Sequence, residues 1–329
     1  MTTSASVTIH PSQFPENVRR DLLTSLRTRR VNHKFHYDSV KQTQKWLALH
    51  AAHSPARNDT DCLKIYDQSF AAAADHLHGK QMQLIGLCCG DGRKDSRLIH
   101  FLKKKGMEVS YVPCDGSLPM TLLARTSASK FIPPDACHPF VCDLKTADDL
   151  PACFSKLAQS SVPRLITFFG TLHNFEPDWI IPRLAALLPR KNDLLLVSAN
   201  LAAGDNYESG LLQILPQYKN RLTLEWLGAF LADLGIPLKA GKMKVVIEPG
   251  STRKSLQRIA IHFIFSRFTS ITVAGELFSF PAGEAIRLFF SYRYSLALAE
   301  KLFNDHGLRV LDQWCSQSGQ EGIFLCRKI

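Results

Sequence analysis

The chain has 329 residues, of which 45% are hydrophobic and 21% are charged. This composition is typical of a globular protein with enough apolar material for a packed core, and it excludes a disordered or fibrous chain. At this length we expect a core domain together with an accessory lobe.

The formal net charge of +11 admits two interpretations: a surface that binds nucleic acid, or a general attraction for anionic small molecules. Lysine and arginine occur in short clusters, at residues 27–30 and 103–105, and they form no long basic stripe. Since no segment resembles a known nucleic-acid-binding module either, we expect no nucleic acid partner.

Targeting and metal-binding patterns are missing from the sequence. No apolar run approaches the roughly 18 residues that span a bilayer, and the first residues do not resemble a secretory signal. The nine cysteines include no C-x-x-C pair, and the twelve histidines show no paired ligand spacing. We therefore expect a cytoplasmic protein with reduced thiols, no membrane association and no metal site.

Taken in chain order, residues 1–14 are mostly small and polar without a periodic pattern, which predicts a flexible N-terminus. Between residues 15 and 65, apolar residues recur at helical spacing, for example at Leu22, Leu23 and Leu26. We expect this stretch to form helices of the accessory lobe.

Helices and strands alternate between residues 66 and 200, which predicts parallel β-α-β units. The expected strands are 82–88, 108–113, 138–142, 164–169 and 193–198. The expected helices are 64–77, 96–105, 120–128, 147–157 and 180–188. Together they predict an open, doubly wound α/β sheet of the Rossmann type.

The pattern changes between residues 201 and 294. A helical part at 211–234, interrupted by Pro216, precedes three expected strands at 243–248, 255–265 and 270–280, with a hairpin turn at Pro249-Gly250. With residues 15–65, this antiparallel insert predicts a second, α+β substrate-binding lobe. Residues 295–329 return to the α/β pattern and complete the core, with a helix at 296–306 and strands at 309–314 and 322–326.

The first expected strand of the core runs into the glycine turn Cys88-Cys-Gly-Asp-Gly-Arg-Lys94. Glycines at a helix start let a ligand approach the backbone closely, although such a turn can also be purely structural. The second strand ends at Asp115, where a carboxylate can accept hydrogen bonds from ribose hydroxyls or can cap the next helix.

The next two strands also end in polar groups. Asp143 follows the third strand, either as an acceptor near an adenine amino group or as a helix cap. Phe168-Phe-Gly-Thr-Leu-His-Asn174 follows the fourth, and an aromatic pair followed by an amide suits a place where cofactor and substrate meet. His173 alone favours a structural role.

In order and spacing, these motifs resemble the histidine-specific Nα-methyltransferases of ergothioneine biosynthesis. The resemblance extends from about residue 35 to the C-terminus. It includes these further segments: Phe35-His-Tyr37-Asp, Tyr111-Val-Pro-Cys-Asp115-Gly-Ser, Phe280-Pro-Ala-Gly-Glu284 and Phe289-Phe-Ser291-Tyr-Arg-Tyr294.

The resemblance implies S-adenosyl-L-methionine as the cofactor, with Gly90 and Lys94 near its methionine part, Asp115 on its ribose and Asp143 near its adenine. The implied cofactor-binding residues are Cys88, Gly90, Gly92, Lys94, Asp115, Gly116, Asp143, Leu144, Phe169 and Gly170. The implied substrate-binding residues are Tyr37, Asn174, Tyr218, Phe289 and Ser291, of which Tyr37, Asn174 and Tyr218 are the catalytic candidates.

Two positions depart from the family pattern. Cys88 stands where the family usually has a glycine, so the backbone there is less free to approach the cofactor. Phe289 stands where the histidine-specific enzymes carry a glutamate that grips the imidazole, whereas Ser291 matches them. An aromatic ring cannot accept the imidazole N–H, and a buried polar group without its partner costs roughly 1–3 kcal/mol. Phe289 favours a larger apolar or aromatic amine, or it fills a gap in the core.

We therefore predict an S-adenosylmethionine-dependent N-methyltransferase that acts in biosynthesis on the amine of a small amino-acid-like or natural-product molecule other than histidine. One alternative is a methyltransferase that acts on protein or RNA, which the net charge of +11 favours. Another is a non-catalytic binding protein on a methyltransferase fold, which the substitution at Cys88 suggests.

Overall fold

The computed structural model describes residues 4–157, 162–204 and 206–329. The chain divides into two compact units. The core unit comprises Met1–Gln13, Pro55–Leu201 and Tyr294–Ile329, and the accessory unit comprises Phe14–Ser54 and Ala202–Arg293. In the described part of the chain, no helix is both long enough and apolar enough to cross a membrane.

The core unit contains one mixed sheet with the strand order β1-β4-β3-β2-β5-β6-β13-β12. Strand β13 is antiparallel to both of its neighbours, and the remaining pairs are parallel. Chain order reverses between β2 and β5, which is the topological switch point of a doubly wound sheet. The predicted Rossmann-type α/β core is confirmed. Its strands are β1 (Thr8–Ile9), β2 (Gln81–Leu87), β3 (Glu108–Asp115), β4 (Phe140–Val141), β5 (Arg164–Phe168), β6 (Leu194–Asn200), β12 (Leu308–Cys315) and β13 (Glu321–Lys328).

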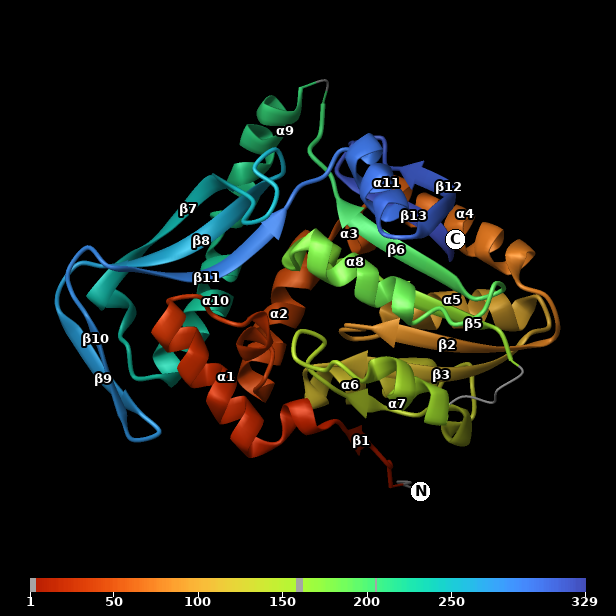
Figure 1. The fold of residues 1–329 in the computed structure, drawn as a ribbon, viewed down its shortest axis with the longest axis horizontal. Helices are drawn as coiled ribbons and strands as arrows, with labels where there is room; N and C mark the ends of the chain where they lie inside the picture. The colour runs from red at the N-terminus through yellow and green to blue at the C-terminus, as the bar shows by residue number, and fades with distance from the viewer. Residues whose placement is uncertain (1–3, 158–161, 205) are drawn as a thin grey trace. The chain divides into compact units, whose positions relative to one another are not determined.

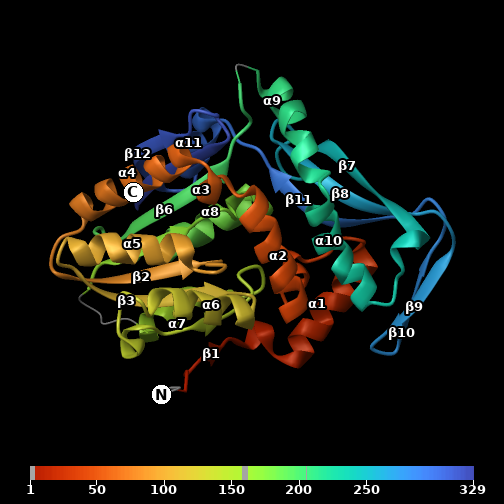
Figure 2. The same cartoon turned by 180° about the vertical axis from the view of Figure 1, so that it is seen from behind.

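Helices cover both faces of this sheet. Helices α8 and α11 lie on one face in Figure 1, and α4 and α5 lie on the other face, seen from behind in Figure 2. The α-helices of the core unit are α3 (Pro55–Asn58), α4 (Thr60–His76), α5 (Arg93–Lys104), α6 (Leu118–Ala128), α7 (Leu150–Leu157), α8 (Pro177–Ala186) and α11 (Leu296–Asp305). The short 3-10 helices are η1 (Pro11–Gln13), η3 (Pro134–Ala136) and η4 (Leu172–Asn174).

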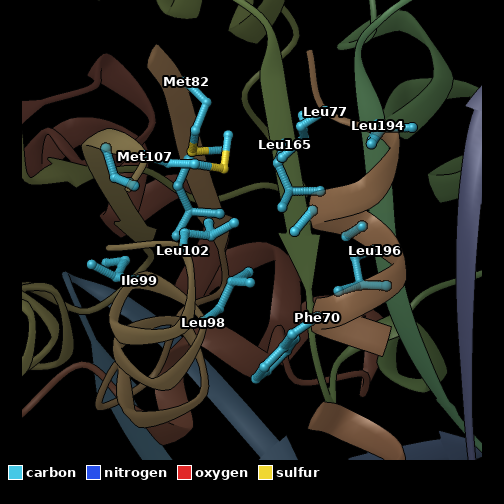
Figure 3. Packing of buried hydrophobic residues seen from close by; sticks show 14 of the residues in the cluster. Phe70, Leu77, Met82, Leu98, Ile99, Leu102, Met107, Leu165, Leu194 and Leu196 are labelled. Carbon is cyan, nitrogen blue, oxygen red and sulfur yellow. The ribbon is translucent and has the colours of Figure 1, made fainter. Parts of the chain in front are cut away.

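The hydrophobic core of this unit follows from the apolar patterning of its elements. Leu98, Ile99 and Leu102 of α5 recur at helical spacing and are fully buried, which directs one face of the helix to the sheet. Figure 3 shows how side chains of α4 and α5 pack with those of β2, β5 and β6. Because both faces of the sheet are covered, its central strands are almost entirely buried.

Two stretches differ from the expected domain boundaries. Residues 55–65 belong to the core unit, because Cys62 and Ile65 lie on the buried face of the continuous helix α4. The segment predicted as a flexible N-terminus includes strand β1, which pairs in parallel with β4, and helix η1. A two-residue strand is too short to leave a periodic signal in the sequence. Residues 1–3 of that predicted terminus lie outside the described residues.

The accessory unit combines helices with two small antiparallel sheets, in the orders β11-β8-β7 and β10-β9. Its helices are α1 (Pro15–Thr28), η2 (His33–His36), α2 (Val40–His53), α9 (Tyr207–Ile214), η5 (Leu215–Tyr218), α10 (Arg221–Asp233) and η6 (Leu238–Ala240). Its strands are β7 (Gly241–Pro249), β8 (Gln257–Phe265), β9 (Thr269–Val273), β10 (Glu276–Phe280) and β11 (Ala285–Tyr292).

Two predictions in this unit are wrong, one of a strand and one of a turn. The single strand expected at 270–280 is the hairpin β9–β10, whose turn residues Ala274 and Gly275 both have positive φ, as a tight two-residue turn requires. Pro249 and Gly250 do not form a tight hairpin turn, because β8 starts only at Gln257. Strand β11 completes the larger sheet beside β8.

Candidate active site

The glycine turn joins β2 to α5 in an unusual backbone conformation. Cys88, Gly90 and Gly92 all have positive φ, of 48°, 55° and 69°. A Cβ on Gly92 would lie 2.5 Å from the Ala124 Cα, so only glycine allows the start of α5 to approach α6 this closely. Cys88 has the same left-handed backbone without the freedom of glycine, at a cost of order 1 kcal/mol.

Asp115 binds the glycine turn directly. Its two carboxylate oxygens accept hydrogen bonds from the backbone N–H of Gly90, at 3.0 Å, and of Ser117, at 2.9 Å. Burial raises the pKa of Asp115 to about 6, against the lowering effect of these N–H donors. The cap of α6 is Ser117, which accepts from the Met120 N–H, and this removes the helix-cap alternative for Asp115. A carboxylate has about four lone-pair sites, so Asp115 can still accept a hydrogen bond from a ligand hydroxyl.

Asp143 follows β4 and is buried together with Leu144. Its carboxylate accepts from the Lys145 N–H at 2.9 Å, and its backbone N–H donates to Ser12 Oγ at 3.0 Å. Residues 144–146 form a turn and not a helix, so Asp143 caps no helix. Its carboxylate lies beyond the carboxyl end of β4. The neighbouring strand β3 ends at Asp115.

Lys94, on the first turn of α5, belongs to a polar network that the sequence did not indicate. Its ammonium donates to the Tyr66 hydroxyl at 2.7 Å and lies 3.8 Å from Glu321. Tyr66 in turn donates to Glu321 at 2.5 Å and lies 3.0 Å from Ser198 Oγ. Burial and the nearby Glu321 carboxylate raise the pKa of Tyr66 well above its usual value, so the phenol stays protonated. Both Tyr66 and Glu321 are buried.

The loop after β5 joins this network. The Gly170 N–H donates to Ser198 Oγ at 2.9 Å, and a Cβ on Gly170 would lie 3.7 Å from the Lys94 ammonium. The Phe169 ring packs edge-on against Tyr66, with ring centroids 5.3 Å apart. Asn174 ends η4 in the same loop and is half-buried. The predicted cofactor residues Lys94, Phe169 and Gly170 are thus neighbours at the switch point.

A second buried acid, Asp95, lies under the glycine turn. It accepts hydrogen bonds from the Tyr111 hydroxyl and the Thr167 hydroxyl, both at 2.7 Å. A Cβ on Gly86 would lie 2.0 Å from the Asp95 carboxylate, so the glycine in β2 makes room for it. Burial raises the pKa of Asp95 to about 6. Asp95 thus ties α5 to two strands, β3 and β5, and its place directly after Lys94 was the only signal of this role in the sequence.

In the accessory unit, the structure brings Tyr218 and Ser291 together. The Tyr218 hydroxyl donates to Ser291 Oγ at 2.8 Å and accepts from the Arg293 guanidinium at 2.6 Å. Arg293 is buried, and its backbone carbonyl accepts from the Tyr207 hydroxyl at 2.7 Å. Arg293 lies in the motif at 289–294 that the sequence singled out, but it was not selected as a site residue.

Phe289 lies among aromatic rings. It stacks on His33, with centroids 4.8 Å apart and an interplanar angle of 20°, and meets Trp226 edge-on at 5.7 Å. The Tyr218 ring lies 6.5 Å away, and Tyr37 lies 5.3 Å from Trp226. Phe289 is 7% exposed and belongs to the buried core of the unit. It therefore both fills the core and neighbours the Tyr218–Ser291 pair.

His10, Asp149 and Cys153 place their possible ligand atoms within 4.8 Å of one another. His10 Nδ1 accepts from the Ser12 N–H at 3.0 Å, so a neutral His10 carries its proton on Nε2. That Nε2 lies 2.7 Å from Asp149, to which it donates, and has no lone pair left for a metal ion. The geometry is that of a hydrogen-bonded pair.

Comparison with known proteins identifies a family. Residues 18–209 and 249–328 match the model of the family described as histidine-specific methyltransferase, SAM-dependent. No curated protein sequence matches the chain.

Several solved structures resemble this one at low identity. An S-adenosylmethionine-dependent methyltransferase from Clostridium acetobutylicum is 13% identical over 87% of this chain and 98% of its own, with a TM-score of 0.44. Magnesium protoporphyrin IX methyltransferase from Synechocystis, with bound SAH, is 12% identical over 88% of this chain and 95% of its own, with a TM-score of 0.45. The match to the family model covers most of the chain.

Proposed function

Since this chain belongs to the family of histidine-specific, S-adenosylmethionine-dependent methyltransferases, we propose that it methylates the amine nitrogen of a small amino-acid-like or natural-product molecule other than histidine. The observation that carries the substrate proposal is Phe289, which replaces the glutamate expected in the histidine-specific members. Its surroundings are the rings of His33 and Trp226. These rings favour an apolar or aromatic group on the substrate.

The carboxyl edge of the core sheet fits the chemistry of the cofactor. Asp115 keeps lone pairs for ribose hydroxyls, Asp143 offers an acceptor for the adenine amino group, and Lys94 offers a cation for the methionine carboxylate. The positive φ values of Gly90 and Gly170 allow a ligand to approach the backbone there. When bound, S-adenosylmethionine supplies an electrophilic methyl group on a sulfonium.

The remaining task of the protein is to orient a neutral amine, because displacement at a methyl group depends on alignment more than on covalent help. We assign this orientation to Tyr37, Asn174 and Tyr218. The Tyr218 hydroxyl already accepts from Arg293 and donates to Ser291, which leaves it one lone pair to accept an N–H of the substrate. An amine that arrives as ammonium must lose a proton, to Tyr37, to Tyr218 or to water.

The test is a calorimetric titration of the purified protein with S-adenosylmethionine and S-adenosylhomocysteine, followed by a screen of amines for methyl transfer. Asp115→Ala should weaken the binding of both ligands at least about a hundredfold. Asp135→Ala is the matched control, because Asp135 is exposed and lies in η3, which precedes β4 and does not follow the carboxyl end of a strand. Aromatic and apolar amino acids should be methylated in preference to histidine.

The other outcomes separate the alternative functions. Methylation of RNA or protein in preference to free amines would mean that the substrate is a macromolecule, as the net charge of +11 allows. Failure of the folded protein to bind either ligand, alone or with amines present, would leave a binding protein on a methyltransferase fold. Preferential methylation of histidine would contradict the role assigned to Phe289.

A further inference from the structure

The segment at residues 8–13 contacts both loops to which the proposed function assigns the adenosine part of the cofactor. Ser12 Oγ accepts the Asp143 backbone N–H at 3.0 Å, and the Gln13 side-chain amide donates to the Gly116 carbonyl at 3.0 Å. Gly116 directly follows Asp115. The segment therefore joins the loop of the proposed ribose carboxylate to the loop of the proposed adenine acceptor.

The segment is itself firmly held on the core unit. Strand β1 extends the sheet beside β4, and the N–H groups of Thr8 and His10 donate to the carbonyls of Pro139 and Val141 at 3.0 and 2.9 Å. The His10 ring makes two further contacts, one within the segment and one to the core unit outside it. Its Nδ1 accepts the Ser12 N–H at 3.0 Å, and its Nε2 lies 2.7 Å from the Asp149 carboxylate.

These contacts act on the backbone next to the binding groups and not on the carboxylates themselves. Ser12 and Asp143 are both about 95% buried, so the Asp143 N–H has no ready access to water if the Ser12 hydroxyl is removed. The Ser12 hydrogen bond therefore fixes the peptide that precedes the Asp143 side chain. Gln13 does the same for the peptide that follows Gly116, at the end of the loop that begins with Asp115.

We propose that Ser12 and Gln13 are positioning residues for the adenosine part of the cofactor, and that the segment at residues 8–13 is a structural component of the cofactor site. This inference rests on the cofactor site of the proposed function. It distinguishes the two ends of the ligand: residues 8–13 support the adenosine end, and the network of Tyr66 and Glu321 supports Lys94 at the methionine end.

The test compares two ligands that share the adenosine part. S-adenosylhomocysteine carries the amino-acid part, and 5′-methylthioadenosine lacks it. Ser12→Ala and Gln13→Ala should each weaken the binding of both ligands by the same factor. We expect about tenfold, which corresponds to about 1.4 kcal/mol. Lys94→Met should weaken the binding of S-adenosylhomocysteine and leave the affinity for 5′-methylthioadenosine unchanged. Thr8→Ala is the matched control on the same segment, because it removes an exposed hydroxyl and should change the affinity for neither ligand.

Calorimetry well below the unfolding temperature separates positioning from stability. If Ser12→Ala and Gln13→Ala lower the melting temperature but bind both ligands like the wild type, the segment is merely structural and the inference is wrong. If Ser12→Ala fails to fold, Gln13→Ala still decides, since its half-buried side chain makes a single described contact to the Gly116 carbonyl. Asp115→Ala tests the site itself, since unchanged binding by that variant would overturn the proposed site. If Asp115→Ala loses binding while Ser12→Ala and Gln13→Ala bind like the wild type, only this inference is overturned.

Discussion

The two units hold their candidate site residues in different ways. In the core unit the acids at the strand ends are held by the backbone, as when Asp115 accepts the N–H groups of Gly90 and Ser117, whereas Lys94 on α5 is held by the side chains of Tyr66 and Glu321. In the accessory unit the candidate residues are held by other side chains, as when Tyr218 lies between Ser291 and Arg293. The backbone N–H groups that hold Asp115 are present whatever the neighbouring side chains are, so substitution of those neighbours leaves the hydrogen bonds in place. A site held by side chains can be altered by one substitution, and we interpret Phe289 as such a change in the proposed substrate site.

The largest expected effect is at the backbone-held site. Asp115→Ala removes the acceptor for both ribose hydroxyls and the partner of the Gly90 N–H. With roughly 1.5–3 kcal/mol for each hydrogen bond to a charged group, S-adenosylhomocysteine should bind at least about a hundredfold more weakly. Calorimetry measures this, and a loss smaller than tenfold would mean that the backbone-held edge is not the cofactor site.

The next effect separates the two regions. Tyr218→Phe removes one hydroxyl and leaves the ring in place, so it should lower kcat/KM for the amine by about ten- to a hundredfold. The affinity for S-adenosylhomocysteine should stay the same, because Tyr218 belongs to the accessory unit. Steady-state kinetics and calorimetry on the same preparation check both statements. A parallel loss of cofactor affinity would show that the two regions are not energetically separate.

Acid should weaken cofactor binding through Asp115. The ionised carboxylate accepts hydrogen bonds from ribose hydroxyls more strongly than the protonated group does, and its pKa is about 6, so lowering the pH from 7 to 5 protonates most of it. The dissociation constant for S-adenosylhomocysteine should rise by about tenfold over this range. Asp115→Asn is the comparison, since its weaker binding should not depend on pH in this window. An identical pH profile for the wild type and this variant would contradict the assignment.

Phe289 tests how far one side chain determines the substrate. Phe289→Glu should increase methylation of histidine relative to aromatic amines, because it restores the acceptor for the imidazole N–H. Placing a carboxylate among the buried rings should also lower the free energy of unfolding by about 3 kcal/mol, whereas Phe289→Leu should cost less. Denaturant unfolding and competition assays measure the two effects. Unchanged substrate preference in folded Phe289→Glu would mean that Phe289 only fills the core.

The smallest effect concerns Cys88. Cys88→Gly relieves a left-handed backbone but adds freedom to the unfolded chain, so the free energy of unfolding should change by no more than about 1 kcal/mol. The dissociation constant for S-adenosylhomocysteine should fall by less than about fivefold, because Cys88 already has the positive φ that a glycine would allow there. Cys88→Ala keeps the Cβ and controls for the loss of the thiol. A much larger gain in affinity would show that the cysteine distorts the turn.

The sequence by itself determined the features that depend on neighbouring residues. Alternating strands and helices, the glycine turn at Gly90 and Gly92, and strand-terminal Asp115 and Asp143 all leave local patterns, and the core sheet follows from them. Local patterning was weakest in the accessory unit, where Ala274-Gly275 divides one apparent strand into a hairpin. Alanine at the first position of such a turn is not a recognisable signal.

Only the tertiary structure decided which distant side chains meet. Glu321 contacts Lys94 and Tyr66 because β13 lies beside β6. Ser12 contacts Asp143 because β1 lies beside β4. Arg293, which directly follows β11, contacts Tyr218. The physical reason is that a hydrogen bond between residues far apart in the chain leaves no periodicity in either segment. Each such residue looks like an ordinary polar position until the sheet brings its partner within 4 Å.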